Sequence, residues 1–204
     1  MKKLKISAIS IIWLCVMIYF KTPFLLPLMC AIAIHELGHI VTARVLKIEI
    51  KRFHLSILGA ALETKGEISY VKELLLAMGG PLFGTLGSIL GFAFLKTKPD
   101  LPATIDFIQY FSTISIVITI FNLIPLATLD GGRILKCIAY IVFPLTLADK
   151  IIKLFSFFTL FALWLFSVYA MLKLSQGVPT FVFCSIFFVK CFVLDTKNGV
   201  LTSF

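Results

Sequence analysis

The sequence predicts an all-α polytopic membrane protein with about six transmembrane helices and a short membrane-surface β segment after the second. Hydrophobic residues make up 60% of the chain and charged residues 14%, and the mean hydropathy of +1.05 is far above that of a soluble globular domain. The apolar runs are about 20 residues long, which is the length that spans a bilayer core. We therefore expect one domain over residues 1–204.

The first two spans are expected before residue 47. Three lysines among the first five residues precede an apolar stretch that ends at Phe20, an arrangement that resembles a signal peptide. The following segment, Lys21–Pro27, lacks a small-x-small cleavage pattern, so we expect the stretch to remain as the first span. The second span is expected from about Pro23 to Leu46.

The hydrophobic period changes between Leu46 and Lys72. Apolar Ile48 and Ile50 alternate with charged neighbours, which predicts one or two short strands at the membrane surface. A basic loop is the alternative. A strand here would offer an exposed edge to an extended substrate.

The third and fourth spans are expected at about Leu74–Leu95 and Ile105–Ile124. In the third, Gly80 with Gly84, and Gly87 with Gly91, form small-x-x-x-small faces. Such faces let another helix approach closely, so helix packing accounts for these glycines.

The topology after Arg133 is decided by charge. The apolar run 134–147 is short for a span, and we expect it to stay at the cytoplasmic surface, with spans five and six at 151–172 and 178–194. Both termini are then cytoplasmic, and so are all 19 Lys and Arg residues except Lys21, Lys96, Lys98 and Lys173. This arrangement obeys the positive-inside rule better than seven spans. Because the basic residues flank apolar segments, the net charge of +9 does not predict a nucleic-acid partner.

The second span contains His35, Glu36 and His39. Two histidines four residues apart on a helix lie on one face and can reach a single ion, with Glu36 beside them. As ordinary helix residues these groups would cost several kcal/mol in lipid, so a functional role is favoured. We expect one Zn²⁺ per chain, held by His35 and His39, with Glu36 as general base and acid rather than ligand.

Asp130, Glu63 and His54 compete as the third ligand. Asp130 follows Pro125 at the end of an apolar helix and precedes two glycines, which allow an irregular backbone to turn inward. Glu63 and His54 lie in the basic, strand-like stretch, where a surface position is simpler. Asp130 is therefore favoured, and three protein ligands would leave a fourth position for a water whose pKa falls toward about 7.

Four motifs follow one another along the chain: His35-Glu-Leu-Gly-His39, Ala43-Arg44, Gly80-Pro81 and Asn122-x-x-Pro125-x-x-x-x-Asp130-Gly131. Together they resemble the site-2 protease family of intramembrane zinc metalloproteases, over a catalytic core of roughly residues 24–136. The resemblance implies a metalloendopeptidase that cleaves a membrane-spanning or membrane-associated protein within or near the bilayer. It also implies that Asn122 hydrogen-bonds the substrate backbone.

The compact form resembles the bacterial branch that releases a sigma factor from its membrane-associated precursor during sporulation. This implies a multi-pass protein of the bacterial cytoplasmic membrane, with its site toward the cytoplasm, a membrane protein substrate and regulatory membrane partners. One departure is Phe83, where family members often carry Asn.

Two other classes stay open at this stage. A metal or proton transporter would show internal repeats, and we find none in the sequence. A non-catalytic binding relative would usually lack Glu36 or a ligand.

Overall fold

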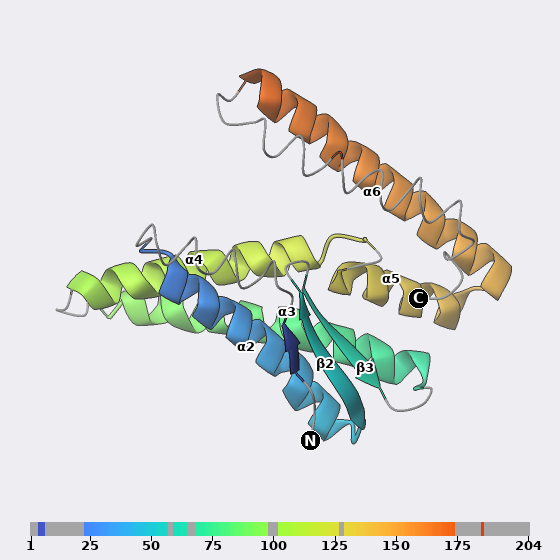
Figure 1. The fold of residues 1–204 in the computed structure, drawn as a ribbon, viewed down its shortest axis with the longest axis horizontal. Helices are drawn as coiled ribbons and strands as arrows, with labels where there is room; N and C mark the ends of the chain where they lie inside the picture. Colours follow the sequence, from blue (N-terminus) through green and yellow to red (C-terminus); the bar gives the residue numbers. More distant parts are fainter. Residues whose placement is uncertain are drawn as a thin grey trace.

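The computed structural model describes residues 4–6, 23–56, 59–64, 68–97, 102–126, 129–173 and 185. For the strands it describes the backbone and not the side chains. The elements are β1 (Leu4–Ile6), α2 (Leu25–Val45), β2 (Ile50–Ser56), β3 (Gly59–Thr64), α3 (Tyr70–Leu95), α4 (Pro102–Asn122), α5 (Asp130–Val142) and α6 (Leu145–Lys173) (Figure 1).

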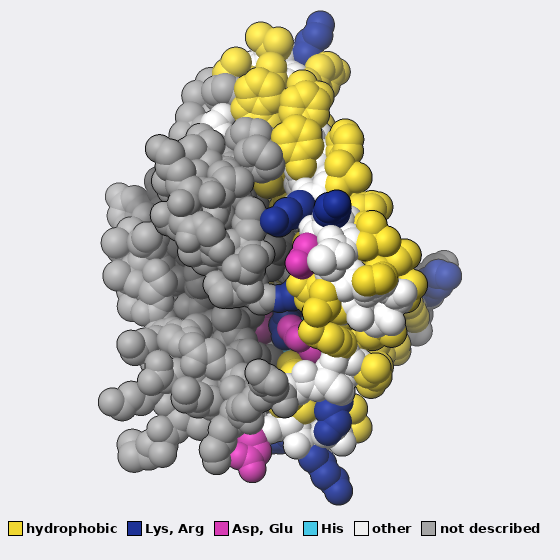
Figure 2. Space-filling model, turned by 90° about the vertical axis from the view of Figure 1, so that its right-hand side faces the viewer, with side chains coloured by type: hydrophobic (Ala, Val, Ile, Leu, Met, Phe, Trp, Pro, Cys, Tyr) yellow, Lys and Arg dark blue, Asp and Glu magenta, His cyan; other side chains and the backbone are white. Residues whose placement is uncertain are grey.

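Helices α2, α3 and α4 pack against one another, and α5 packs on α3. The long helix α6 leads away from this bundle and is joined to it through α5 (Figure 1). Among the described residues, four helices are long and apolar enough to cross a membrane: α2, α3, α4 from Thr104 onward, and α6. Their outer faces expose large hydrophobic side chains, such as Leu90 and Phe166, as lipid-facing helices do. Figure 2 shows one face on which hydrophobic side chains predominate among the described residues, with acidic and basic groups near its centre.

These four helices match the predicted second to fifth spans within a few residues, apart from α6, which begins six residues early. The expected total of six is not supported by the part of the chain that the structure describes, which contains four candidates. The predicted first and sixth spans fall almost wholly outside the described residues. Most of the run 134–147 lies in α5, which is too short to be a candidate span, and its position at the membrane surface stays a prediction.

Helix α2 ends in a Schellman turn that directs the chain into β2. The Ile48 N–H donates to the Ala43 carbonyl at 2.8 Å, and the Lys47 N–H donates to the Arg44 carbonyl at 3.1 Å. Lys47 has a φ of 54°, a left-handed conformation that usually favours glycine. Buried Ile48 then packs with Ala43 and with Leu76 of α3, which ties this turn to the helix bundle.

The sheet has the order β1-β2-β3. Strands β2 and β3 pair antiparallel in the segment for which the sequence predicts one or two short strands. Strand β1 pairs parallel with β2, and this strand was not predicted, so the expectation of a purely helical fold outside one β segment was wrong. Three residues carry no periodic signal of their own, and a parallel partner about 50 residues away is a long-range contact. The position of the sheet relative to a membrane stays a prediction.

Candidate metal centre

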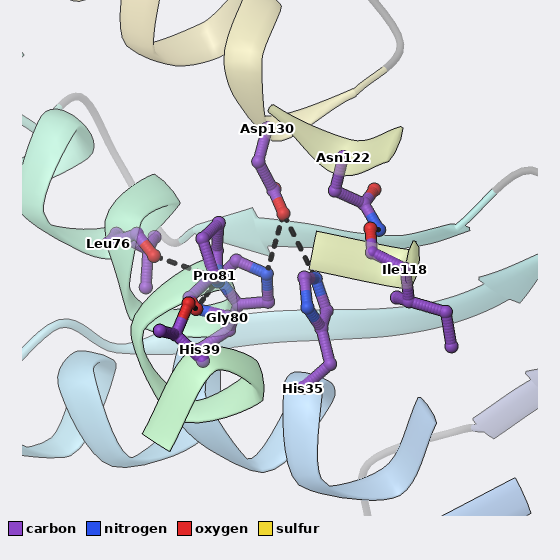
Figure 3. Close-up of polar contacts among 9 residues, drawn as sticks. His35, His39, Leu76, Gly80, Pro81, Ile118, Asn122 and Asp130 are labelled. Carbon is purple, nitrogen blue, oxygen red and sulfur yellow. Dashed lines mark hydrogen bonds and ion pairs between the residues drawn. The ribbon is translucent and has the colours of Figure 1, made fainter. Parts of the chain in front are cut away.

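Two histidines and one aspartate converge inside the helix bundle (Figure 3). The Nε2 atoms of His35 and His39 lie 3.1 and 3.2 Å from the same carboxylate oxygen, Oδ2 of Asp130. The histidines are each 4% exposed and Asp130 is 8% exposed. One ligand atom from each residue lies within 4.8 Å of the other two, so the cluster could hold a metal ion.

The histidine face of α2 is held against α3 by a glycine contact. A Cβ on Gly38 would collide with the Gly79 carbonyl oxygen, and a Cβ on Gly79 would lie 2.5 Å from Oγ1 of Thr42. The two backbones therefore touch where α2 crosses α3, which is the close approach that small residues permit. Because Gly38 directly precedes His39, this crossing carries the imidazoles to the surface of α3.

The outer nitrogen of His39 is held by α3. Its Nδ1–H donates to the carbonyl oxygen of Leu76 at 2.8 Å. A proton on Nδ1 leaves the lone pair of Nε2 directed at Asp130, and a metal requires this tautomer.

Asp130 reaches the histidines because the chain breaks between α4 and α5. Helix α4 ends at Asn122, Pro125 follows, and α5 begins at Asp130 itself. A Cβ on Gly131 would collide with the Leu123 carbonyl oxygen, so only glycine lets α5 start this close to the end of α4. The N-terminal end of a helix also favours a carboxylate electrostatically.

The donor set and the space both fit zinc. Two imidazole nitrogens and a carboxylate oxygen are common zinc ligands, and neighbouring ligand atoms of a tetrahedral site lie about 3.3 Å apart. The distances of 3.1 and 3.2 Å are close to that value. A Cβ on Gly80 would collide with Nε2 of His39 and lie 2.6 Å from Nε2 of His35, so glycine keeps the space between the two nitrogens open.

Comparison with known proteins identifies a peptidase domain in this chain. Residues 68–166 match the model of peptidase family M50. Residues 68–166 therefore form a peptidase family M50 domain. This is the site-2 protease family that the sequence motifs resemble. The matched range contains Asn122 and Asp130 of the M50 domain and begins after the histidine motif.

Two known proteins are similar to this chain. A protein of Synechocystis sp. (strain ATCC 27184 / PCC 6803 / Kazusa), named as the candidate zinc metalloprotease sll0528, is 33% identical over 128 residues. That match covers 58% of this chain, and the chain spans only about a third (33%) of the relative's length. The solved structure of the site-2 protease from Methanocaldococcus jannaschii has the same fold, with a TM-score of 0.62 at 21% identity, covering 89% of this chain and 88% of the other.

Of the predicted site residues, the structure brings His35, His39 and Asp130 together. Glu36 is half-buried on α2 beside the cluster and is not one of its three members. Asn122 is half-buried, and its Nδ2 donates to the Ile118 carbonyl at 3.0 Å within α4 (Figure 3). The roles predicted for Glu36 and Asn122 stay predictions.

The two competing ligands, His54 and Glu63, lie in β2 and β3. Their side chains are outside the described part of the structure.

Sequence reasoning missed two features of the site. Gly80 was assigned to helix packing alone, although the structure sets its backbone against the imidazoles. The Leu76 carbonyl that holds His39 was not foreseen. Pro81 is no signal for it, because the carbonyl that this proline leaves without a helical donor is that of Ala77, four residues earlier.

Proposed function

We propose that the chain is a zinc-dependent intramembrane endopeptidase that cleaves a membrane-spanning or membrane-associated protein within or near the bilayer. The observation that carries the proposal is the buried His35–His39–Asp130 cluster in a chain with an M50 domain. His35 lies ten residues from either end of α2, a candidate span, so the cluster is far from both ends of that helix. Three ionisable groups at such a depth are costly unless they are paired or hold a metal.

In this proposal His35, His39 and Asp130 hold one Zn²⁺. Bound zinc supplies Lewis acidity, which polarises a carbonyl and lowers the pKa of water. Glu36 removes a proton from the attacking water and passes it to the nitrogen of the leaving peptide, as general base and then acid. Asn122 binds the substrate backbone. An amide has two N–H donors and an acceptor oxygen, so the bond to Ile118 uses only part of its capacity.

The membrane arrangement that we propose has six spans, with both termini and the site toward the cytoplasm of a bacterium. The charge distribution supports it, because four of the 19 Lys and Arg residues then lie outside. The 13 residues of α5 also support six spans over seven, because such a helix is about 20 Å long and a bilayer core is about 30 Å thick. Residues 1–204 then form one metalloprotease domain, with its core at residues 24–136.

We propose membrane-spanning or membrane-associated proteins as the substrate class, such as a transcription-factor precursor or an anti-sigma factor, with regulatory membrane partners controlling access. The family resemblance supports this class. The sporulation branch stays a prediction.

The Glu36→Gln variant tests this function. Because Glu36 carries a proton and is not a ligand, the variant should keep about one zinc per chain and cleave at least about a hundredfold more slowly. The measurements are the zinc content of purified protein and cleavage of a single-span test substrate in proteoliposomes. A matched control is Glu49→Gln, an exposed acid beyond the end of α2. Loss of zinc in Glu36→Gln, or undiminished cleavage, would contradict the proposal.

A further inference from the structure

The two histidines of the centre differ in their outer nitrogens. The Nδ1–H of His39 donates to the Leu76 carbonyl. Among the described residues, Nδ1 of His35 has no hydrogen-bond partner, although it is fully buried. A metal-binding histidine almost always donates its outer N–H to a carboxylate, a carbonyl or a water. A buried N–H without a partner costs roughly 1 to 3 kcal/mol.

Gly84 of α3 lies near this nitrogen and near two polar atoms of α4. A Cβ on Gly84 would collide with Oγ1 of Thr119 on α4, and would lie 3.7 Å from Nδ1 of His35 and 3.8 Å from the Ser115 carbonyl oxygen. These three polar atoms from α2 and α4 therefore surround one region at the surface of α3. The side chain of Thr119 is 2% exposed, and its hydroxyl has no partner among the described residues either.

We propose that Thr119 is a positioning residue for His35 and acts through one water bound between α2, α3 and α4. The water accepts the Nδ1–H of His35 and donates one hydrogen to Oγ1 of Thr119 and the other to the Ser115 carbonyl. A buried water commonly makes about three hydrogen bonds of this kind. The bridge satisfies two buried groups at once. It keeps the proton of His35 on Nδ1, so that Nε2 faces the metal.

A packing role alone would not single out Thr119. Ser112 is also fully buried on α4, its hydroxyl also lacks a partner among the described residues, and it lies against Gly91 of α3. It is thus a matched hydroxyl two turns away from Thr119, next to a glycine but not next to His35. If buried hydroxyls serve only to let α3 and α4 approach each other, substitutions of Thr119 and of Ser112 should change zinc affinity equally.

The inference rests on the proposed zinc binding, and the experiment separates the two. Zinc affinity is measured by chelator competition on purified full-length protein and on the Thr119→Val, Thr119→Ser and Ser112→Ala variants. Loss of an outer partner of a ligand typically weakens metal binding about 10- to 100-fold, and we expect this for Thr119→Val. Thr119→Ser keeps the hydroxyl and should bind within about threefold of wild type, as should Ser112→Ala.

A second readout reports on the ligand itself. The visible spectrum of the Co²⁺-loaded protein should change in Thr119→Val and not in Ser112→Ala, because only the former alters the environment of His35. Thermal unfolding of the metal-free proteins checks folding. If Thr119→Val folds poorly, Thr119→Ala takes its place, since it also lacks the hydroxyl.

Each outcome decides the inference. Wild-type affinity and spectrum in Thr119→Val would overturn it. Equal losses in Thr119→Val and Thr119→Ser, or in Thr119→Val and Ser112→Ala, would also overturn it, because packing would explain them. Failure of the wild-type protein to bind zinc would refute the proposed function instead.

Discussion

The histidines and Asp130 are held in place by two regions with different kinds of packing. On the histidine side, α2 crosses α3 with backbone against backbone at Gly38 and Gly79. On the aspartate side, one tight glycine, Gly131, is combined with large apolar side chains, and Leu126 and Leu129 form a buried cluster with Leu160 of α6. The first region depends on glycine contacts alone, whereas the second also depends on a cluster of leucine side chains.

This difference determines which substitutions each region tolerates. Close-packed glycines fail when a side chain is added, because helix backbones must then move apart. Leucine clusters fail when atoms are removed, because a cavity remains. On the histidine side, Gly80 also keeps open the space between the Nε2 atoms of His35 and His39. We therefore expect substitutions on this side to lower zinc affinity most strongly.

The largest effect is expected for Gly80→Ala. The new methyl group would collide with Nε2 of His39 and crowd Nε2 of His35. We expect zinc affinity to fall by about a hundredfold or more, with a stability cost of about 1 to 3 kcal/mol from overpacking. Chelator competition and thermal unfolding of the metal-free protein measure the two effects separately.

Gly87→Ala is the matched control on the same helix. Its Cβ would meet only the ends of side chains, at 3.3 Å from the Phe111 ring and 3.5 Å from Ile34. These can shift by a few tenths of an ångström, so zinc binding should stay as in wild type. Equal losses in Gly80→Ala and Gly87→Ala would mean that α3 tolerates no side chain anywhere, and the special role of Gly80 would be wrong.

The next effect is expected on the aspartate side, for Gly131→Ala. Its Cβ would collide with the Leu123 carbonyl oxygen and lie 2.6 Å from that of Ile124. Backbone atoms cannot rotate away, so the start of α5 must move and carry Asp130 with it. We expect zinc affinity to fall about tenfold or more by the same competition assay. Unchanged affinity would show that Asp130 is not a ligand, or that its segment adapts freely.

The sequence predicted the parts of this centre that depend on local spacing. The separation of four residues between His35 and His39 defines a helix face wherever that helix lies. The interruption at Pro125 and Gly131 indicated an inward turn at Asp130, and the structure brings this residue to the histidines. Each of these signals is contained within about ten residues.

The features that were missed depend on where helices cross. Neither the contact between Gly80 and the imidazoles nor the bond from His39 to the Leu76 carbonyl follows from either helix alone. Both require the register of α2 against α3, which glycine spacing permits but does not specify. The pairing of β1 with β2 was missed for the same reason, because it joins segments about 50 residues apart.

A smaller effect is expected for Leu160→Ala, which removes atoms from the leucine cluster. Leu160 is 5% exposed and lies against Leu126 and Leu129. We expect a loss of about 2 kcal/mol in the free energy of unfolding, with zinc affinity changed only a few-fold, because the cluster supports the segment and not the ligand itself. Leu165→Ala, at a 48% exposed position of α6, should cost far less. A hundredfold loss of zinc in Leu160→Ala would contradict the contrast between the two regions.

The smallest effect is expected for Tyr140→Phe, at the junction of α5 and α6. The Tyr140 hydroxyl donates to Oδ1 of Asp149 at 2.7 Å, and this bond, together with partial burial, raises the pKa of Tyr140 to about 12. Removing the hydroxyl should cost about 1 kcal/mol near neutral pH, measured by chemical unfolding. Tyr169→Phe, which changes a 60% exposed tyrosine of α6, should leave stability unchanged.

The stability difference between wild type and Tyr140→Phe should also depend on pH. A phenol that is harder to ionise in the folded state than in the unfolded chain, where its pKa is about 10, adds stability that is fully present below pH 10. Above that pH the contribution declines and is lost as the folded group ionises near pH 12, because a phenolate cannot donate to a carboxylate. The stability difference between wild type and Tyr140→Phe should therefore be constant from pH 7 to about 9.5 and shrink above pH 10. A difference that grows with pH would show that the hydroxyl does not donate to Asp149, and the junction of α5 and α6 would then depend on its apolar contacts alone.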